Sequence, residues 1–256
     1  MSDAPPPEPV ALRGLRTQAR IGLRRAGRGM ATAPMLAFQL DHARARDAVH
    51  TPLDVSAVAA ALSRPALTVE SNAADRATFL TRPDLGRSLA LASAEALAAR
   101  RAGPCDLAIV LADGLSAAAL HTHDAPVANR IMAALPNWRI AEPVIACQSR
   151  VALGDAIGAA LDAAMVLVLI GERPGLSAPD SLGAYLTWAP AIGRRDSERN
   201  CVSNIRPPHG LSHAAACDTI TWLLREARRR RGSGIALKDL RQSDGLLAGA
   251  NFLGNV

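Results

Sequence analysis

The chain has 256 residues, of which 49% are hydrophobic and 3% aromatic, and its formal net charge at pH 7 is +6. This length suits one large domain, or one domain with a long arm. The scarcity of aromatic residues argues against recognition of single-stranded nucleic acid by base stacking. The four cysteines, Cys105, Cys147, Cys201 and Cys217, form no C-x-x-C pair, which argues against a zinc site or a disulfide framework and favours a reducing compartment.

Residues 1–10 are rich in proline, and we expect them to form a disordered tail. They contain no basic segment followed by an apolar one, so they do not look like a secretion signal, and no run in the chain is apolar over a membrane-spanning length. A soluble, cytoplasmic protein is therefore expected. Residues 11–68 combine an Arg-rich stretch with helical periodicity over 35–49 and 53–67, which predicts a helical N-terminal arm with little core of its own.

From residue 69 onward, apolar runs typical of strands alternate with amphipathic, helical segments. The predicted strands cover 106–112, 138–147 (interrupted by Pro143), 166–170, 185–188 and 201–205, and the predicted helices cover 83–102, 116–121, 128–135, 151–165 and 212–230. Ser212 is the expected N-cap of the last helix, and Gly232 is expected to end it. This alternation predicts an α/β fold over residues 69–256, a Rossmann-like, mainly parallel sheet with flanking helices.

Polar, turn-rich segments follow several of the predicted strands. The clearest is Gly171-Glu172-Arg173-Pro174-Gly175, directly after the apolar run 166–170. The others are residues 113–116 (DGLS), residues 148–150 (QSR) and the stretch 201–210. In an open parallel sheet such segments meet at the carboxyl edge, where ligands bind. They therefore form a candidate binding rim, and the alternative is a set of unrelated turns and helix caps.

Common catalytic and cofactor motifs are missing. The chain has no G-x-G-x-x-G fingerprint, no G-x-x-x-x-G-K-[ST] phosphate loop, no H-E-x-x-H zinc motif and no G-x-S-x-G nucleophile elbow. Residues 121–124 (HTHD) could supply metal ligands but are more typical of a surface loop. Cys201, two residues after Arg199, could have a lowered pKa, although a structural cysteine at a strand start is the commoner case. The basic run 228–231 suits the C-terminal end of the last helix.

Four motifs occur in an order and spacing that resemble the small (light) subunit of ethanolamine ammonia-lyase. They are residues 80–87 (LTRPDLGR), 113–116 (DGLS), 171–176 (GERPGL) and 201–205 (CVSNI), and the resemblance covers about residues 20–235. It implies a carbon–nitrogen lyase that uses adenosylcobalamin and radical chemistry to convert ethanolamine to acetaldehyde and ammonia. It also implies a large partner subunit that binds ethanolamine and performs the chemistry, in a hetero-oligomer that is a trimer of dimers of large–small pairs.

The resemblance assigns the cobalamin contacts of this chain to Val151, Glu172 and Cys201, and it assigns the chain no catalytic residue and no metal ligand. A carboxylate such as Glu172 can accept hydrogen bonds from the amides at the corrin edge. Val151 offers backbone groups and an apolar surface, and Cys201 offers a backbone N–H and a small side chain. The Asp-x-His-x-x-Gly signature that supplies a cobalt ligand in other cobalamin proteins is absent, as expected for a family whose cofactor keeps its own benzimidazole ligand.

Two other functions stay open from the residues alone. One is a free-standing Rossmann-like nucleotide-binding enzyme, which would need a phosphate-binding glycine loop that the sequence lacks. The other is a nucleic-acid or scaffold protein that uses the basic arm, although we expect neither nucleic acid nor a membrane as a partner. In some relatives a longer N-terminal segment is linked to packaging in a bacterial microcompartment. The short Pro-rich start found here argues against packaging through that segment.

Overall fold

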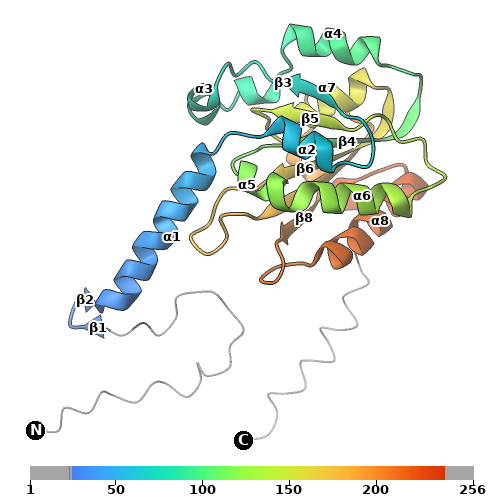
Figure 1. The fold of residues 1–256 in the computed structure, drawn as a ribbon. Helices are drawn as coiled ribbons and strands as arrows, with labels where there is room; N and C mark the ends of the chain where they lie inside the picture. Colours follow the sequence, from blue (N-terminus) through green and yellow to red (C-terminus); the bar gives the residue numbers. More distant parts are fainter. Residues whose placement is uncertain (1–22, 24, 240–256) are drawn as a thin grey trace, which may run out of the picture.

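A six-stranded sheet runs through the centre of the computed structural model, which describes residues 23 and 25–239 (Figure 1). Its strands are β3 (Leu67–Glu70), β4 (Cys105–Ala112), β5 (Val144–Cys147), β6 (Ala163–Gly171), β7 (Leu182–Trp188) and β8 (Arg199–Ile205). They lie in the order β3-β5-β4-β6-β7-β8. The first four run parallel to one another, and β7 runs antiparallel to β6 and β8. The predicted α/β fold with a mainly parallel sheet is confirmed.

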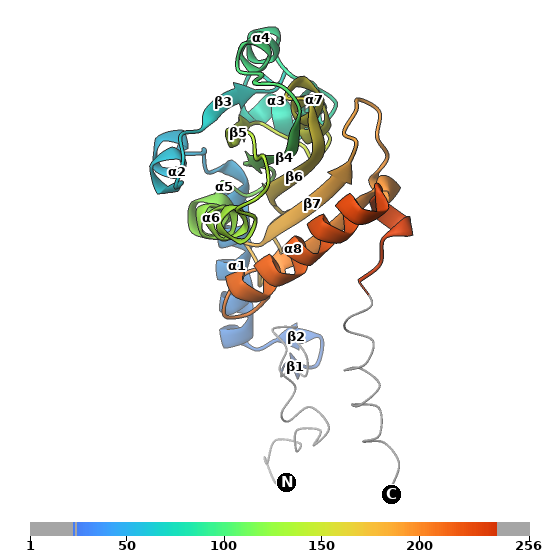
Figure 2. The ribbon, with the colours of Figure 1, turned by 90° about the vertical axis from the view of Figure 1, so that its right-hand side faces the viewer.

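Helices cover both faces of this sheet. They are α2 (Val55–Ala61), α3 (Arg76–Thr81), α4 (Leu91–Ala99), α5 (Ala117–Ala119), α6 (Ala125–Ala134), α7 (Leu153–Ala160) and α8 (His213–Arg230), with short 3₁₀ turns η2 (Leu85–Arg87), η4 (Asp196–Glu198) and η5 (Gly234–Ala236). α6 and α8 lie side by side on one face, and α4 and α7 pack on the other (Figure 2). Successive residues of β6, such as Leu167 and Val168, enter opposite apolar clusters, which explains the continuous apolar runs of the central strands.

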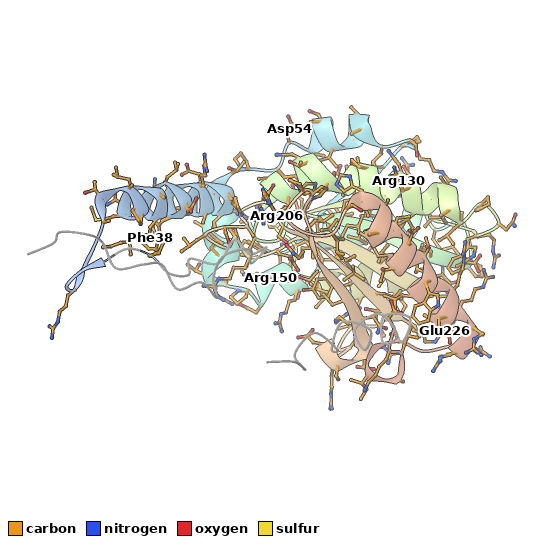
Figure 3. All side chains as sticks on the ribbon, turned by 90° about the horizontal axis from the view of Figure 1, so that it is seen from below. Phe38, Asp54, Arg130, Arg150, Arg206 and Glu226 are labelled. Carbon is orange, nitrogen blue, oxygen red and sulfur yellow. The ribbon has the colours of Figure 1, made fainter. Side chains whose placement is uncertain are left out.

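The N-terminal arm consists of α1 (Thr32–His50), preceded by a hairpin of β1 (Arg25–Ala26) and β2 (Gly29–Met30). α1 projects away from the sheet, with Phe38 along the projecting part (Figure 1, Figure 3). Ala48, near the end that joins the body, is its buried residue. α2, in contrast, packs Val58 into the core, and Leu67 already pairs with Val144 in the sheet. The predicted tail, residues 1–10, and the start of the arm lie outside the described residues.

Three predicted elements are shorter than their sequence patterns suggest. The helix predicted over 151–165 is wrong beyond Ala160, because Asp162 adopts a left-handed backbone (φ 54°) and the next residues enter β6. The helix predicted over 83–102 is divided into η2 and α4. The strand predicted over 138–147 reduces to β5, since Pro143 cannot donate to a ladder and Ile140 makes only an isolated bridge to Leu107.

Two local predictions about helix ends and loops also need correction. Residues 121–124 are not a surface loop, because with Leu120 they form a π-helical turn, η3 (Leu120–Asp124), continuous with α5 and α6, in which His123 and Asp124 are buried. Ser212 caps α8 as predicted, by accepting a hydrogen bond from the Ala215 amide. The left-handed residue that ends α8 is Arg231 (φ 54°), not Gly232.

Candidate functional site

The segments that follow β4, β5, β6 and β8 meet at one edge of the sheet, as the sequence predicts. The Leu115 amide donates to the Gly171 carbonyl (3.0 Å), and the Asn204 amide donates to the Glu172 carboxylate (3.3 Å). A Cβ on Gly171 would lie 2.0 Å from the Ser116 carbonyl oxygen, so the segments after β4 and β6 touch backbone to backbone. These segments are one connected rim and not a set of unrelated turns.

Asp113 holds the segment after β5 against the end of β4. Its buried carboxylate accepts hydrogen bonds from the amides of Gln148 (3.0 Å) and Ser149 (2.9 Å) and from the Arg76 guanidinium (3.2 Å). Burial raises the pKa of Asp113, and the donors and the charge of Arg76 act against that rise. Asp113 is therefore a structural residue that fixes the shape of the rim.

A pocket of about 370 Å³ opens at this rim, between the ends of β4, β5 and β6. Arg150, Val151, Glu172 and Tyr185 are among its lining residues. The chain leaves β4 toward α6 on one face of the sheet and leaves β5 toward α7 on the other face. Open α/β sheets bind ligands at such a divergence, so the pocket is the candidate functional site.

Glu172 is held in this site by groups from two other strands. Its Oε2 accepts a hydrogen bond from the Ser181 hydroxyl (2.6 Å), just before β7, and its Oε1 accepts one from the Ser203 hydroxyl (2.5 Å) on β8. Gly183 leaves room for the carboxylate, since a Cβ there would lie 2.8 Å from Oε1. A carboxylate has roughly four acceptor positions, so Glu172 keeps capacity for a donor from a ligand.

Cys201 pairs with Tyr185 across β8 and β7, and the two side chains share one face of these strands. On this face Cys201 and Ser203 are exposed, whereas α8 packs against the apolar residues of the opposite face. Although part of the residue is open to solvent, desolvation of the Cys201 thiol raises its pKa; the Tyr185 hydroxyl partly offsets this, and the charge of Glu172 raises it further. The alternative of a lowered thiol pKa next to Arg199 is wrong, and Cys201 stays a neutral thiol.

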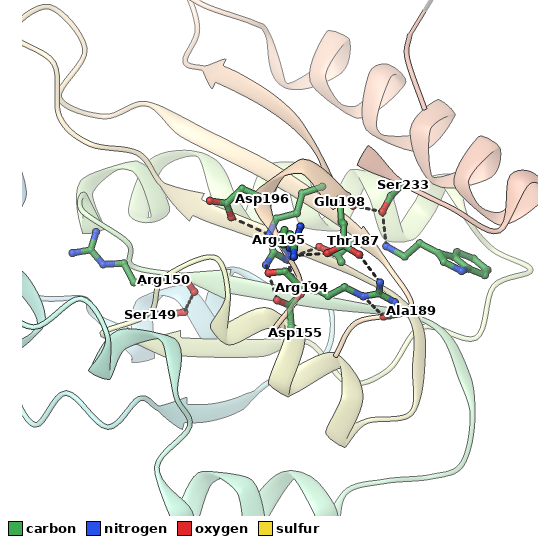
Figure 4. A network of polar contacts seen from close by, with 12 residues as sticks. Ser149, Arg150, Asp155, Thr187, Ala189, Arg194, Arg195, Asp196, Glu198 and Ser233 are labelled. Atoms are coloured by element: carbon green, nitrogen blue, oxygen red, sulfur yellow. Dashed lines mark hydrogen bonds and ion pairs between the residues drawn. The ribbon is translucent and has the colours of Figure 1, made fainter. Parts of the chain in front are cut away.

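The Arg199 side chain instead forms a buried ion pair with Asp155 of α7, within the network shown in Figure 4. Its Nη1 and Nη2 each lie 2.7 Å from a carboxylate oxygen of Asp155, and Nη1 also donates to the Thr187 hydroxyl (2.9 Å). Val151 lies four residues before Asp155, and Cys201 lies two residues after Arg199. The ion pair therefore joins α7, which follows Val151, to the start of β8, which contains Cys201.

The three site residues predicted from the sequence lie close to one another. Val151 and Glu172 line the same pocket, and Cys201 is the strand partner of Tyr185, which also lines it. Ser181 and Tyr185, which hold or flank these residues, were not predicted as part of the site, and Ser203 was predicted only as part of the rim segment 201–210 and not as a partner of Glu172. A period-two pattern over 201–205 could have placed Ser203 on the same face as Cys201, but the pairing of β8 with β7 could not be read from the sequence.

The histidines of η3 have partners within the chain. Among the residues that the structure describes, no group of three or more His, Cys, Asp or Glu side chains could hold a metal ion. His121 Nε2 accepts a hydrogen bond from the Asp54 amide, and His123 Nδ1 lies 3.0 Å from His213 Nε2. Burial and the neighbouring His213 lower the pKa of His123, which favours a neutral, structural imidazole pair.

Comparison with known proteins shows the family. Residues 9–238 match the family model of the ethanolamine ammonia-lyase light chain. The chain is 55% identical over 229 residues to the ethanolamine ammonia-lyase small subunit of Bradyrhizobium diazoefficiens, with 87% of each chain covered. It is 50% identical over 254 residues to that of Ralstonia nicotianae, with 95% of this chain and 93% of the relative covered, and 48% identical over 267 residues to that of Azotobacter vinelandii, with 99% and 98% covered. The chain belongs to the ethanolamine ammonia-lyase light-chain, or small-subunit, family.

Proposed function

We propose that this chain binds adenosylcobalamin at an interface with the large subunit of ethanolamine ammonia-lyase, and that it is active only within that complex. The gathering of Val151, Glu172 and Cys201 at one rim and one open strand face carries the proposal. The relatives are named small subunits, which supports a large partner. We further propose that the partner binds ethanolamine and that the assembly is a trimer of dimers of large–small pairs.

The residues of the rim fit the edge of a corrin. Cobalamin has a large, flat ring with carboxamide groups along its edge and a nucleotide tail. The side chains of Val151 and Ile170 and the ring of Tyr185 suit contact with the apolar parts, and Glu172 suits an amide N–H. Ligand pockets commonly measure about 300–1,000 Å³ for much smaller molecules. A pocket of about 370 Å³ can therefore cover only part of the cofactor, which favours a site shared with a second subunit.

Adenosylcobalamin supplies the radical chemistry by which ethanolamine is converted to acetaldehyde and ammonia. In this proposal Glu172 accepts a hydrogen bond that orients one edge of the cofactor. Val151 and Tyr185 exclude water from that edge, and the neutral Cys201 thiol gives a small, weakly polar contact. None of these residues acts on ethanolamine, so the chain contributes binding and orientation and no catalytic residue.

The projecting helix α1 is the proposed docking element for the large subunit. Leu36, Phe38 and Leu40 are 56%, 40% and 51% exposed, and exposed apolar groups of this kind mark protein interfaces. The four cysteines are all free thiols, and we propose that the complex works in the cytoplasm, free or within a bacterial microcompartment. Among the described residues, the structure contains no helix with the length and apolarity needed to span a bilayer.

Co-expression with the large subunit tests the proposal. We expect ammonia release from ethanolamine only when both subunits and adenosylcobalamin are present, and binding of the cofactor by the purified complex in an ultrafiltration assay. Each subunit alone is the control. A stable complex that binds no cobalamin would contradict the proposed cofactor site, and the absence of any complex would contradict the proposed partner.

Substitution of Glu172 tests whether this chain contacts the cofactor. Glu172→Ala should raise the adenosylcobalamin concentration needed for half-maximal activity about tenfold or more, because the hydrogen bond to a charged acceptor is lost. Ser177→Ala, an exposed residue of the same loop, is the matched control and should leave that concentration unchanged. If both variants need the same adenosylcobalamin concentration for half-maximal activity, Glu172 does not contact the cofactor.

A further inference from the structure

Arg150 is a cation that the described part of the chain does not neutralise. It lines the rim pocket together with Val151 and Glu172. Its guanidinium stacks on the Phe79 ring, 4.4 Å from the ring centre, and its Nη2 makes a long contact with the Phe79 carbonyl oxygen (3.5 Å). Its buried Nε has no hydrogen-bond partner among the described residues. In Figure 4 the side chain extends away from the polar network around Asp155.

Asp113 is an acid whose charge acts on Arg150, but its carboxylate already has other partners. Its carboxylate accepts from the amides of Gln148 and Ser149 and pairs with Arg76 at 3.2 Å. Arg76 lies 5.0 Å from the ring centre of Phe79, so two guanidinium groups stack on one aromatic ring. Burial, together with the positive charges of Arg76 and Arg87, lowers the pKa of Arg150, and the charge of Asp113 offsets this only in part. A half-buried, uncompensated guanidinium is costly unless an anion completes the site.

The surroundings of the pocket add further positive charge. Arg173 also lines it, and α7 begins at Leu153, three residues after Arg150, so the positive end of the helix dipole lies nearby. The carboxylate of Glu172, on another segment of the lining, is engaged by Ser181 and Ser203. The pocket thus offers an acceptor at Glu172 and a strong, planar donor at Arg150. A ligand that fits both has an N–H group and an anionic oxygen.

We propose that Arg150 binds the phosphodiester group in the nucleotide tail of cobalamin. The inference rests on the proposed function, since it assumes that the pocket receives this cofactor. The phosphodiester is the anionic group on the periphery of cobalamin, whereas the carboxamides of the corrin are neutral and would leave the charge of Arg150 buried and unpaired. Guanidinium groups bind phosphate oxygens through two parallel N–H donors. Glu172 would then accept a hydrogen bond from the carboxamides at the corrin edge, and Arg150 would donate to the phosphodiester of the nucleotide tail.

Two cofactor probes test this assignment in the purified large–small complex. Adenosylcobalamin has the nucleotide tail, and adenosylcobinamide lacks it together with the phosphodiester. We expect Arg150→Met to weaken equilibrium binding of adenosylcobalamin about 10- to 100-fold and to change binding of adenosylcobinamide less than about twofold. Arg150→Lys keeps the charge but not the paired donors, so its loss of adenosylcobalamin binding should be intermediate.

Arg87→Met is the matched control, because Arg87 is an exposed arginine whose charge acts on Arg150 but which does not line the pocket. It should change the binding of either probe less than about twofold. If Arg150→Met weakens both probes equally, or neither, the assignment is overturned. If the unmodified complex binds neither probe, the proposed function itself fails. Co-purification with the large subunit checks that each variant is folded.

Discussion

Ser203 acts on the candidate site through Glu172, whose Oε1 accepts the Ser203 hydroxyl at 2.5 Å. Ser203→Ala removes this donor and leaves Glu172 with fewer groups that fix its orientation. Because a hydrogen bond of this kind contributes about 1 kcal/mol, we expect the adenosylcobalamin affinity of the large–small complex to fall about fivefold. Turnover at saturating cofactor should not change, since no reacting group is touched. A cofactor titration of ammonia release measures both values.

Ser203→Thr keeps the hydroxyl and suits a strand, so it should restore most of the affinity. Ser197→Ala, an exposed serine of η4, serves as the control for a serine replacement that touches no site residue. A fall in turnover with unchanged cofactor affinity would contradict the positioning role of Ser203.

Asp124 gives a residue-level prediction about stability. Its side chain is buried at the junction of η3 and α6, where it accepts a hydrogen bond from the Ala125 amide, and Oδ2 has no partner among the described residues. Burial raises its pKa from 3.8 to about 7. Because the pKa is higher in the folded than in the unfolded chain, the stabilisation by protonated Asp124 is complete below the unfolded pKa and is lost as the pH rises through 7.

Asp124→Asn keeps the shape of the side chain and stays neutral. At about pH 8 it should therefore melt at a higher temperature than the parent, with an upper limit on the order of 4 kcal/mol, and at about pH 4 the difference should vanish. Asp75, the exposed N-cap of α3, has a pKa lowered mainly by the Thr78 amide. At pH 8, Asp75→Asn should melt at a lower temperature than the parent. Equal melting of Asp124→Asn and the parent at pH 8 would show that the carboxyl is not buried.

At the scale of elements, the ion pair between Asp155 and Arg199 connects α7 to β8. The two side chains are 1% and 2% exposed. Among the described residues, removal of Asp155 therefore leaves the charge of the buried Arg199 guanidinium with only the longer contact of its Nε to the exposed Asp196 carboxylate (3.4 Å). Asp155→Asn should reduce the free energy of unfolding by about 3–5 kcal/mol, and the double change Asp155→Leu, Arg199→Met should recover much of that loss. Urea unfolding of the full chain measures both.

The exposed pair of Arg100 and Glu142 is the control for this prediction, because its side chains are 59% and 30% exposed. Arg100→Met should cost less than about 1 kcal/mol. If Asp155→Asn costs no more than Arg100→Met, the pair does not hold α7 to β8. A second consequence follows for function, since loosening α7 moves Val151 relative to Cys201 and should raise the cofactor requirement.

The elements also show how far the sequence predicts this fold. β4 and β6 are recognisable because both faces of a central strand are buried and leave an uninterrupted apolar run. The same property hides the end of α7, since Leu161 and Met165 continue the apolar pattern across the left-handed Asp162. The rim could be predicted because it follows from strand ends alone. The partners of Glu172 could not, because Ser181 and Ser203 reach it only through the antiparallel pairing of β7 with β6 and β8.

At the scale of the whole molecule, two separate surfaces could contact a large subunit: the rim of the sheet domain and the projecting helix α1. The candidate pocket lies at the carboxyl edge of the sheet, and α1 projects from the body (Figure 1). The apolar side chains of α1, Leu36, Phe38 and Leu40, are exposed along the helix. A helix that is apolar on its exposed surface gains stability from a partner and not from its own sequence. The same exposure predicts poor solubility of the chain when it is expressed alone.

Replacement of Leu36, Phe38 and Leu40 by Gln tests this division without shortening the chain. These side chains are already about half buried, so covering the remainder of each one contributes roughly 1 kcal/mol. The triple variant should therefore bind the large subunit ~100-fold more weakly or worse. When expressed without the large subunit, the triple variant should be more soluble than the parent because it exposes less apolar surface. It should still fold, because the substitutions lie outside the two apolar clusters of the sheet domain. Leu91→Gln, at a 75% exposed position on α4, is the matched control and should co-purify with the large subunit like the parent. Unchanged co-purification of the triple variant, or of a chain that lacks the arm, would assign docking to the sheet domain instead.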